Sequence, residues 1–309
     1  MSSIHSIIVN YNSGDWLSRC LTSVISNSDA GITVVDNCST DDSLLLAQYK
    51  FAGKAESNSQ ARINWLLNKQ NIGFAAANNQ VLKDIDGDFV LLLNPDCEID
   101  KDTLPLMLKA FIDNPNLGLA SCAIYNEDGS LQKTCRRRFP TPWSAVVRML
   151  QLNRLFPNNE KFKNFDYGDQ QMDLSTQVEF VEAISGAFMM VRKDALDSVG
   201  LLDEGYFMHC EDLDWCKRFE KSDWDVGFVP QAGVIHAKGV SSKSRPIRVL
   251  WTLHKGMNRF FDKHYFANYS LLLSYLVKFG IWFSFILRSS HHLLRGILSD
   301  VMKLIIKNK

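Results

Sequence analysis

The feature that most constrains the fold is an apolar run, residues 89–93, that stops at Asn94-Pro95-Asp96. Five successive apolar residues match a strand buried on both faces, as in a parallel sheet covered by helices. Pro95 has no N–H and disfavours helical backbone at Asn94, so the strand must end there. Asp96 is therefore expected at the carboxyl end of a central strand, where open α/β sheets bind ligands. Taken alone, Asn-Pro-Asp is equally consistent with an ordinary turn.

Strands and helices alternate on both sides of this run. Strands are expected at residues 4–9, 32–35, 63–67, 117–124, 178–184, 187–191, 224–229 and 234–236. Helices are expected at residues 15–26, 44–49, 74–82, 103–112, 143–155, 194–199 and from about 211 to 221. Repeated βαβ order predicts an α/β fold with a mostly parallel, doubly wound sheet and helices on both faces.

Polar residues end several of the expected strands, namely Asn10, Asp36, Asn68 and Asn94. The carboxyl ends of parallel strands meet at one edge of a sheet, so these side chains are expected to form a polar rim there. One asparagine at a strand end is usually a turn former. Four polar residues on the same edge favour a ligand site.

Two later motifs carry further candidate chemistry. Glu211-Asp212-Leu213-Asp214-Trp215 places three carboxylates at a helix start, where the helix dipole offsets part of their repulsion. Aromatic neighbours suggest a partly dry site in which a carboxylate can accept a proton from a hydroxyl. His236 ends a short strand and would be a metal ligand if Asp96 were its partner. A lone histidine is more often structural.

Charge is distributed unevenly along a chain whose net charge is zero. Residues 238–309 carry thirteen Lys and Arg but only two Asp. Within them, the apolar segment 271–287 is slightly shorter than the ~20 residues of a spanning helix, and residues 291–306 are amphipathic. This pattern predicts a basic helical tail that lies on the cytosolic face of a membrane. The alternative is that these helices pack on the core or on another subunit.

Seven cysteines, an odd number without a CxxC pair, indicate reduced thiols in a cytosolic protein with no zinc site. The N-terminus lacks a basic region followed by a long apolar run, so no signal peptide is expected. Localisation is thus predicted as cytoplasmic, with peripheral association to the inner membrane.

Five motifs together resemble the ordered motif set of glycosyltransferase family 2, and its bacterial rhamnosyltransferase-like branch most of all. The motifs are Ile7–Asn12, Val34–Asp41, Asn71–Ala75, Leu93–Asp96 and Gly205–Trp215. The resemblance covers about residues 4–265. It implies a GT-A fold, a nucleotide-sugar donor, a divalent metal (Mg²⁺ or Mn²⁺) and an inverting single displacement.

The resemblance also implies a role for individual residues. Asp212 would be the catalytic base, and Asp96 and His236 would hold the metal. The donor nucleotide would contact Asn10, Asn12, Asp36, Asn71, Gly73, Asn78 and Asn94. The acceptor or donor sugar would contact Gly186, Glu211 and Trp215. Asn94 stands where the family has the first acid of its Asp-x-Asp motif, which argues against a metal role for this residue.

The predicted domains are residues 1–245, a GT-A domain with a nucleotide-binding half (1–115) and an acceptor or catalytic half (116–245), and the membrane-associating tail 246–309. The expected reaction transfers L-rhamnose from dTDP-L-rhamnose to a lipid-diphosphate-linked acceptor in O-antigen-type polysaccharide synthesis. A transferase of galactofuranose or an N-acetylhexosamine from a UDP-sugar is the runner-up, and a non-catalytic nucleotide-sugar-binding protein is a remoter alternative. No nucleic-acid partner is expected, and a homo-oligomer stays open.

Other enzyme classes fit the sequence less well. A dehydrogenase would need G-x-G-x-x-G after the first strand, where only Gly14 is present. A nucleotidyltransferase would need a glycine-rich phosphate loop with a basic residue near the N-terminus, which the sequence lacks.

Overall fold

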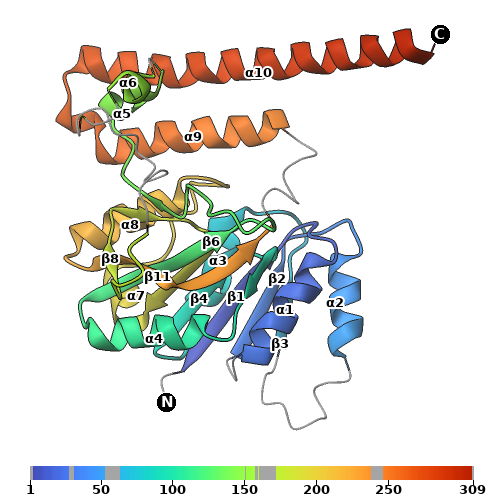
Figure 1. Cartoon of the computed structure of the whole chain (residues 1–309), viewed down its shortest axis with the longest axis vertical. Coiled ribbons are helices and arrows are strands. Elements are labelled where there is room, and N and C mark those ends of the chain that lie inside the picture. Colours follow the sequence, from blue (N-terminus) through green and yellow to red (C-terminus); the bar gives the residue numbers. More distant parts are fainter. Residues whose placement is uncertain are drawn as a thin grey trace. The chain divides into compact units, whose positions relative to one another are not determined.

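The structure is a computed structural model that describes residues 3–27, 31–52, 63–149, 151–156, 159, 172–237 and 246–307. The chain forms two compact units. The first unit comprises residues 1–204 and 211–241 and is a mixed α/β sheet with helices on both faces (Figure 1). The second unit comprises residues 205–210 and 242–309 and is helical. The predicted domain boundary at 245/246 adjoins residues 238–245, which lie outside the described residues.

One large sheet forms the centre of the first unit. Its strands are β1 (Ile4–Asn10), β2 (Gly31–Asp36), β3 (Ile63–Leu67), β4 (Phe89–Leu93), β5 (Cys97–Ile99), β6 (Leu117–Tyr125), β8 (Glu179–Phe180), β10 (Phe188–Arg192) and β11 (Asp225–His236). Their order is β3-β2-β1-β4-β10-β6-β11-β5, and β8 pairs with β11. The first four strands are parallel, whereas β10 runs antiparallel to both β4 and β6.

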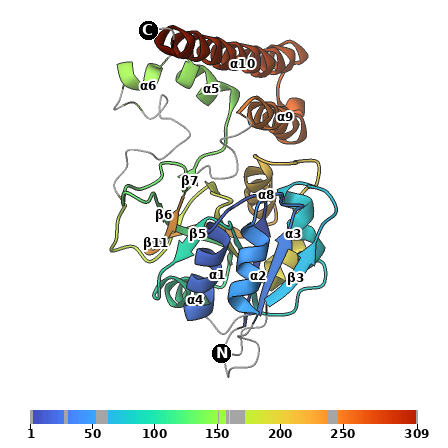
Figure 2. The ribbon, with the colours of Figure 1, turned by 90° about the vertical axis from the view of Figure 1, so that its right-hand side faces the viewer.

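Helices on both faces bury this sheet. The helices of the first unit are α1 (Trp16–Asn27), α2 (Ser43–Phe51), α3 (Phe74–Leu82), α4 (Thr103–Asp113), α5 (Pro142–Met149), α6 (Leu152–Leu155), α7 (Lys193–Val199) and α8 (Glu211–Lys221). Of these, α5 and α6 pack against each other. The connections through α1 and α2 lead outward to β3, and the connection through α3 returns to β4. Because parallel crossovers are right-handed, α1 and α2 cover one face and α3 the other (Figure 2).

The apolar run of β4 is the centre of the core, as its sequence predicts. All five of its residues are buried, and the strand lies between β1 and β10. Beyond its last residue, the Asn94 backbone N–H donates to the Ala187 carbonyl at 2.9 Å. The start of β10 is therefore fixed against the end of β4.

Several expected elements differ in the structure. The two strands expected at 224–229 and 234–236 form the single strand β11, whose pairing with β6 shifts register between Val229 and Gly233. The strand expected at 178–184 divides into β8 and β9 (Ala183–Ile184), and β9 pairs with β7 (Arg136–Arg137). The helix expected at 143–155 divides into α5 and α6, with Gln151 in the left-handed region at φ 52°.

The second unit contains a helical hairpin. It consists of α9 (Pro246–His264), a single 3-10 turn η2 (Phe266–Asn268) and α10 (Leu271–Lys307). The apolar and amphipathic segments expected at 271–287 and 291–306 belong to one continuous helix. Within it, Leu271–Arg295 is long and apolar enough to cross a membrane, since the helix continues past the apolar segment recognised in the sequence.

Candidate active site

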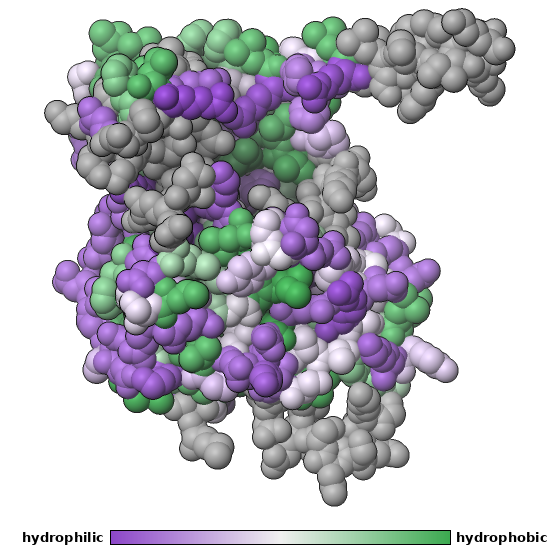
Figure 3. Space-filling view, viewed as in Figure 1, coloured by the Kyte–Doolittle hydropathy of each residue, from purple (hydrophilic) through white to green (hydrophobic). Residues whose placement is uncertain are grey.

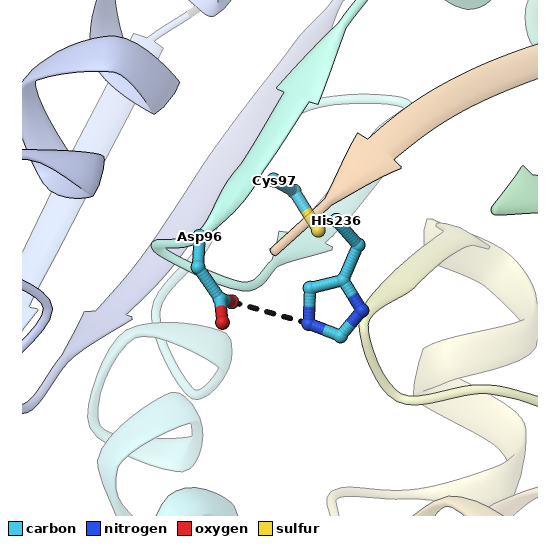
Figure 4. A group of neighbouring side chains, drawn as sticks. All are labelled: Asp96, Cys97 and His236. Atoms are coloured by element: carbon cyan, nitrogen blue, oxygen red, sulfur yellow. Dashed lines mark ion pairs between the residues drawn. The ribbon is translucent and has the colours of Figure 1, made fainter. Parts of the chain in front are cut away.

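Asp96 and His236 meet at the end of the sheet, as the metal hypothesis requires. His236 is the last residue of β11, and the pairing of β11 with β5 sets it opposite Cys97. The His236 Nε2 atom lies 3.2 Å from the Asp96 Oδ1 atom, and both side chains are mostly buried (Figure 4). The ligand atoms of Asp96, Cys97 and His236 all lie within 4.8 Å of one another.

Gln132 orients the imidazole ring of His236. Its Nε2 atom donates to the His236 carbonyl at 3.0 Å, which turns its Oε1 atom toward the His236 Nδ1 atom at 3.2 Å. Because an amide oxygen only accepts, Nδ1 carries a proton. The lone pair of a neutral ring is then on Nε2, facing Asp96. Such outer contacts are typical of metal-ligating histidines.

The arrangement fits a divalent cation. Two acceptor atoms 3.2 Å apart require a proton or a cation between them. Ligands bound at about 2.1 Å and at right angles lie about 3 Å apart, as in octahedral Mg²⁺ sites. Burial and the neighbouring Asp96 raise the pKa of the Cys97 thiol, so this residue is a poor ligand. A carboxylate with an imidazole suits Mn²⁺ or Mg²⁺ better than a thiolate-binding metal.

Asp212 is held in the first turn of α8 by three donors. The Gly186 N–H donates to its Oδ2 atom at 3.0 Å, and the Arg137 guanidinium pairs with the same oxygen. The Leu213 N–H donates to its Oδ1 atom at 2.8 Å. A carboxylate accepts about four hydrogen bonds, so this network orients Asp212 and leaves capacity for a hydroxyl proton.

Glu211 is the buried neighbour of this acid. Burial raises its pKa to about 8, and the adjacent Asp212 carboxylate contributes to the shift. Its Oε2 atom is buried and has no hydrogen-bond partner among the described residues. Glu211 is therefore suited to hold a proton at neutral pH and to donate it in a hydrogen bond.

Two hydrogen bonds and the short backbone segments between them connect the Asn94–Asp96 turn with Asp212. Asn94, two residues before Asp96, donates to Ala187, and the preceding residue Gly186 donates to Asp212. The path exists because β10 pairs with β4 in the register Phe188 to Leu93. The carboxylates of Asp96 and Asp212 are thus brought to the same end of the sheet. The pairing of β4 with β10 therefore fixes the position of Gly186 relative to Asn94.

The residues of β1 and β2 expected to contact the donor nucleotide form a polar network. Asn10 Nδ2 donates to Asp36 Oδ1 at 2.8 Å, joining the ends of β1 and β2. The Ser39 N–H donates to the other carboxylate oxygen of Asp36 at 3.0 Å. In the neighbouring loop, Asn12 accepts from the Thr40 N–H at 2.7 Å and has a φ of 52°. The predicted polar rim is therefore present on β1 and β2.

The loop before α3 completes this rim. Asn71 accepts from the Gly73 N–H and from the Asn37 amide, both at 3.0 Å. Gly73 has φ 91°, a conformation that favours glycine, immediately before the helix. Asn78 donates to the Phe74 carbonyl, and its Oδ1 atom is buried with no hydrogen-bond partner among the described residues.

The structure brings together most of the predicted site residues but places Trp215 elsewhere. This side chain has no exposed surface, donates to the Gly200 carbonyl at 2.9 Å and packs edge-on against Phe219. We expected it beside the acceptor; in this structure it supports α8 from the core. The sequence analysis assigned no role to Arg137 or Gln132, which orient Asp212 and His236.

Comparison with known proteins agrees with this architecture. The solved structure of GalNAc-T7 with UDP, GalNAc and Mn²⁺ aligns with a TM-score of 0.55 at 17% identity, over 76% of this chain and 44% of that one. The alignment thus spans less than half of the GalNAc-T7 chain. At this identity the comparison establishes the fold, and it confirms the expected GT-A architecture.

Two curated relatives are similar in sequence. One is the N-acetylglucosaminyl-diphospho-decaprenol L-rhamnosyltransferase of Mycobacterium tuberculosis (strain CDC 1551 / Oshkosh), 26% identical over 84% of each chain. The other is rhamnosyltransferase WbbL of Escherichia coli (strain K12), 26% identical over 75% of this chain and 83% of WbbL. The model of glycosyl transferase family 2 matches residues 6–200. The chain belongs to this family, as its motifs predict.

Proposed function

We propose that this glycosyltransferase inverts the donor's anomeric carbon as it transfers L-rhamnose from dTDP-L-rhamnose to a lipid-diphosphate-linked saccharide. The setting is the assembly of a cell-surface polysaccharide of the O-antigen type at the cytosolic face of the inner membrane. Two relatives named as rhamnosyltransferases support the donor sugar, and one of them is named for a diphospho-decaprenol acceptor. The observation that carries the proposal is the hydrogen-bonded path that joins the Asp96 region to Asp212.

Asp212 is the general base of this reaction. Its carboxylate accepts the proton of the acceptor hydroxyl. The oxygen of that hydroxyl attacks the anomeric carbon of the donor from the face opposite the nucleotide. Arg137 and the Gly186 N–H hold the carboxylate in place. One displacement, with the bond to the diphosphate breaking as the new bond forms, inverts that carbon.

Glu211 and the polar rim position the two substrates. A protonated Glu211 donates a hydrogen bond to a sugar oxygen, which would satisfy its buried Oε2 atom. Asn10, Asp36 and the loop around Asn71 hold the nucleoside at the carboxyl ends of β1 and β2. A divalent cation bound by Asp96 and His236 would neutralise negative charge on the departing nucleoside diphosphate.

A donor panel tests this function. Purified protein is incubated with radiolabelled dTDP-L-rhamnose, UDP-galactofuranose or UDP-N-acetylglucosamine and a synthetic N-acetylglucosaminyl-diphospho-polyprenol. We expect transfer from dTDP-L-rhamnose, loss of transfer with EDTA, recovery with Mn²⁺ or Mg²⁺, and an inverted anomer by NMR. Transfer from a UDP-sugar alone would replace rhamnose as the donor, and full activity in EDTA would refute the metal site.

A further inference from the structure

The helices α9 and α10 pack against each other through one face of each. Trp251 of α9 contacts Trp282 and Phe285 of α10, with ring centroids 5.0 and 5.5 Å apart. Lys278 of α10 pairs with Asp262 of α9 at 2.9 Å. These contacts determine which side of α10 is turned toward α9.

The opposite side of α10 is an exposed apolar face. Figure 3 shows apolar side chains gathered along one edge of this helix. Residues at its centre are Leu272, Leu276, Phe279, Phe283, Ile286 and Leu287, all exposed. Their spacing of three or four places them on one side of a helix. An apolar face of this length needs a covering partner.

A lipid surface fits this face better than a transmembrane position does. Length and composition alone would allow Leu271–Arg295 to span a bilayer. A spanning α10 would take its partner α9 into the hydrocarbon, together with Arg248, Lys255 and Arg259. Charged residues are costly there. An α10 helix that lies in the plane of the interface buries its apolar face and leaves α9 in water.

Three of the four Lys and Arg residues of α9 form a stripe on one side of the helix. Arg248, Lys255 and Arg259 are all exposed and are spaced by seven and four residues. This spacing places them on one face over a length of about 16 Å. We call these three residues the basic stripe. Its density of positive charge suits a ligand with several negative charges.

Aromatic residues flank the basic stripe. The Arg248 guanidinium lies over the Phe207 ring at 5.7 Å, and the Arg259 guanidinium lies over the Tyr206 ring at 5.4 Å. The loop 205–210 that carries these rings approaches α9 closely, since a Cβ atom on Gly256 would lie 2.7 Å from the His209 carbonyl. The next residue in the chain is Glu211, which starts the helix of the proposed base.

We propose that the basic stripe of α9 binds the diphosphate of the lipid-linked acceptor while α10 lies in the membrane interface. The inference rests on the function proposed above and adds the acceptor's binding site. The site takes a lipid diphosphate, and arginine suits phosphate because its planar guanidinium can donate two parallel N–H hydrogen bonds.

The height of the stripe above the bilayer supports a diphosphate as the ligand. Packed helices have axes about 8–10 Å apart. With the apolar face of α10 sunk about 5–10 Å into the boundary of headgroups and acyl chains, α9 lies one helix diameter further out. The phosphates that link a membrane-embedded polyprenol to a sugar lie at the same height as α9, just outside the acyl chains.

Steady-state kinetics with the full-length protein test this proposal. The triple variant R248Q/K255Q/R259Q is compared with K50Q/K83Q/K101Q, which loses the same charge at exposed lysines of the first unit. We expect the stripe variant to raise KM for the lipid-diphosphate acceptor at least tenfold and to leave KM for the nucleotide-sugar unchanged. The control variant should change neither constant.

Vesicle sedimentation distinguishes a diphosphate from other anionic lipid. Wild-type and stripe variant are mixed with phosphatidylcholine vesicles that contain polyprenyl diphosphate, polyprenyl monophosphate or phosphatidylglycerol at equal charge. Selective loss of binding to the diphosphate vesicles supports the proposal. Equal loss on all three would overturn it in favour of general attraction to anionic lipid, and so would an unchanged acceptor KM.

A labelling experiment tests whether α10 lies in the plane of the membrane. The activity of the wild-type protein with lipid diphosphates then separates failure of this inference from failure of the proposed function. Single cysteines are introduced at Leu271 and Arg295 in a variant whose native cysteines are replaced by serine or alanine, and vesicle-bound protein is labelled with an impermeant maleimide. Labelling of both sites from outside supports the in-plane position, and protection of one site overturns it. If wild-type protein fails to use any lipid diphosphate, the proposed function fails instead.

Discussion

At the scale of single residues, Asp212 and Asp214 are two acids of one helix with separate predicted roles. Asp212 faces Gly186 and Arg137, whereas Asp214 is fully buried and pairs with Arg218 at 3.0 Å. Asp212→Asn preserves shape but removes the base, so we expect kcat to fall about 10²–10⁴-fold with little change in melting temperature. A near-normal kcat would assign the base elsewhere.

Asp214→Asn is the matched control for this prediction. Arg218 also donates to the Val199 and Leu201 carbonyls, so its carboxylate partner helps to hold the loop before α8. Loss of the buried charge should destabilise the fold by on the order of 3 kcal/mol, measured by urea denaturation, and should leave kcat of the folded fraction nearly unchanged. The two variants thus separate chemistry from stability.

Glu211 predicts a pH dependence of stability. Its pKa in the folded protein is raised to about 8, against 4.5 for a glutamate carboxyl in water. Between these values the folded state binds a proton that the unfolded state has lost. Its contribution to stability is therefore complete below about pH 4.5, declines as pH rises, and is lost above about pH 8. The slope is at most about 1.4 kcal/mol per pH unit.

Glu211→Gln tests this by replacing the protonated acid with a neutral amide. Thermal unfolding from pH 5 to 9 should show wild-type protein losing melting temperature relative to the variant across the window from 4.5 to 8. Parallel curves would show that Glu211 is ionised in the folded protein. Activity adds a second readout, because an ionised Glu211 beside Asp212 is unable to donate a hydrogen bond to a sugar.

At the scale of elements, the loop after β6 orients the histidine of the candidate metal site on β11. Gln132 holds both the carbonyl and the Nδ1 atom of His236. Gln132→Leu removes both contacts, and we expect affinity for Mn²⁺ to fall about 10–100-fold by EPR or titration calorimetry. His236→Ala should abolish binding. If Gln132→Leu bound Mn²⁺ normally, the ring of His236 would be oriented by other contacts.

The elements also show how far the sequence predicts the site. The end of β4 at Asn94-Pro95-Asp96 is local chemistry, and the structure has it where the sequence places it. The position of β10 between β4 and β6 depends on pairing with residues about 70 to 100 positions away, which no local pattern encodes. That pairing alone brings Gly186 beside the end of β4 and so gives Asp212 its place.

Arg137 shows a different limit of prediction. The sequence has three successive arginines, 136–138, and their order does not say which faces the site. Alternate residues of a strand point to opposite sides, so β7 sends Arg136 to Glu179 and Arg137 to Asp212. The sequence predicts that neighbouring arginines point to opposite sides of the strand. Which of them faces Asp212 depends on how β7 pairs with β9. Trp215 differs from expectation because α8 turns that side chain toward the core.

At the scale of the whole molecule, positive and negative charge are concentrated in different parts of the chain. The whole excess of basic residues lies in residues 238–309, and an equal acidic excess lies in residues 1–237. Such a division favours attraction of the tail to anionic lipid and repels the acidic surface from it. Screening by salt should therefore weaken vesicle binding but should leave the apolar contribution of α10 intact.

The apolar contribution can be isolated by substitution. Leu276, Phe279 and Phe283 lie on the exposed face of α10, and all three are exposed in the structure. Burial of each such side chain in lipid is worth about 1.5–3 kcal/mol. Replacing Leu276 and Phe283 by Asp should therefore lower partitioning into phosphatidylglycerol vesicles more than a hundredfold, measured by flotation in 1 M salt, where charge attraction is screened.

Exposed apolar residues of α2 provide the matched control. Leu45 and Tyr49 are more exposed than Phe283. If membrane binding followed exposed apolar surface in general, Leu45→Asp with Tyr49→Asp would reduce flotation as much as the α10 pair. We expect no reduction, because α2 lies in the first unit and carries no long apolar face. An equal effect of both pairs would show that α10 is not the membrane contact, since its long face would then have no advantage over isolated apolar residues.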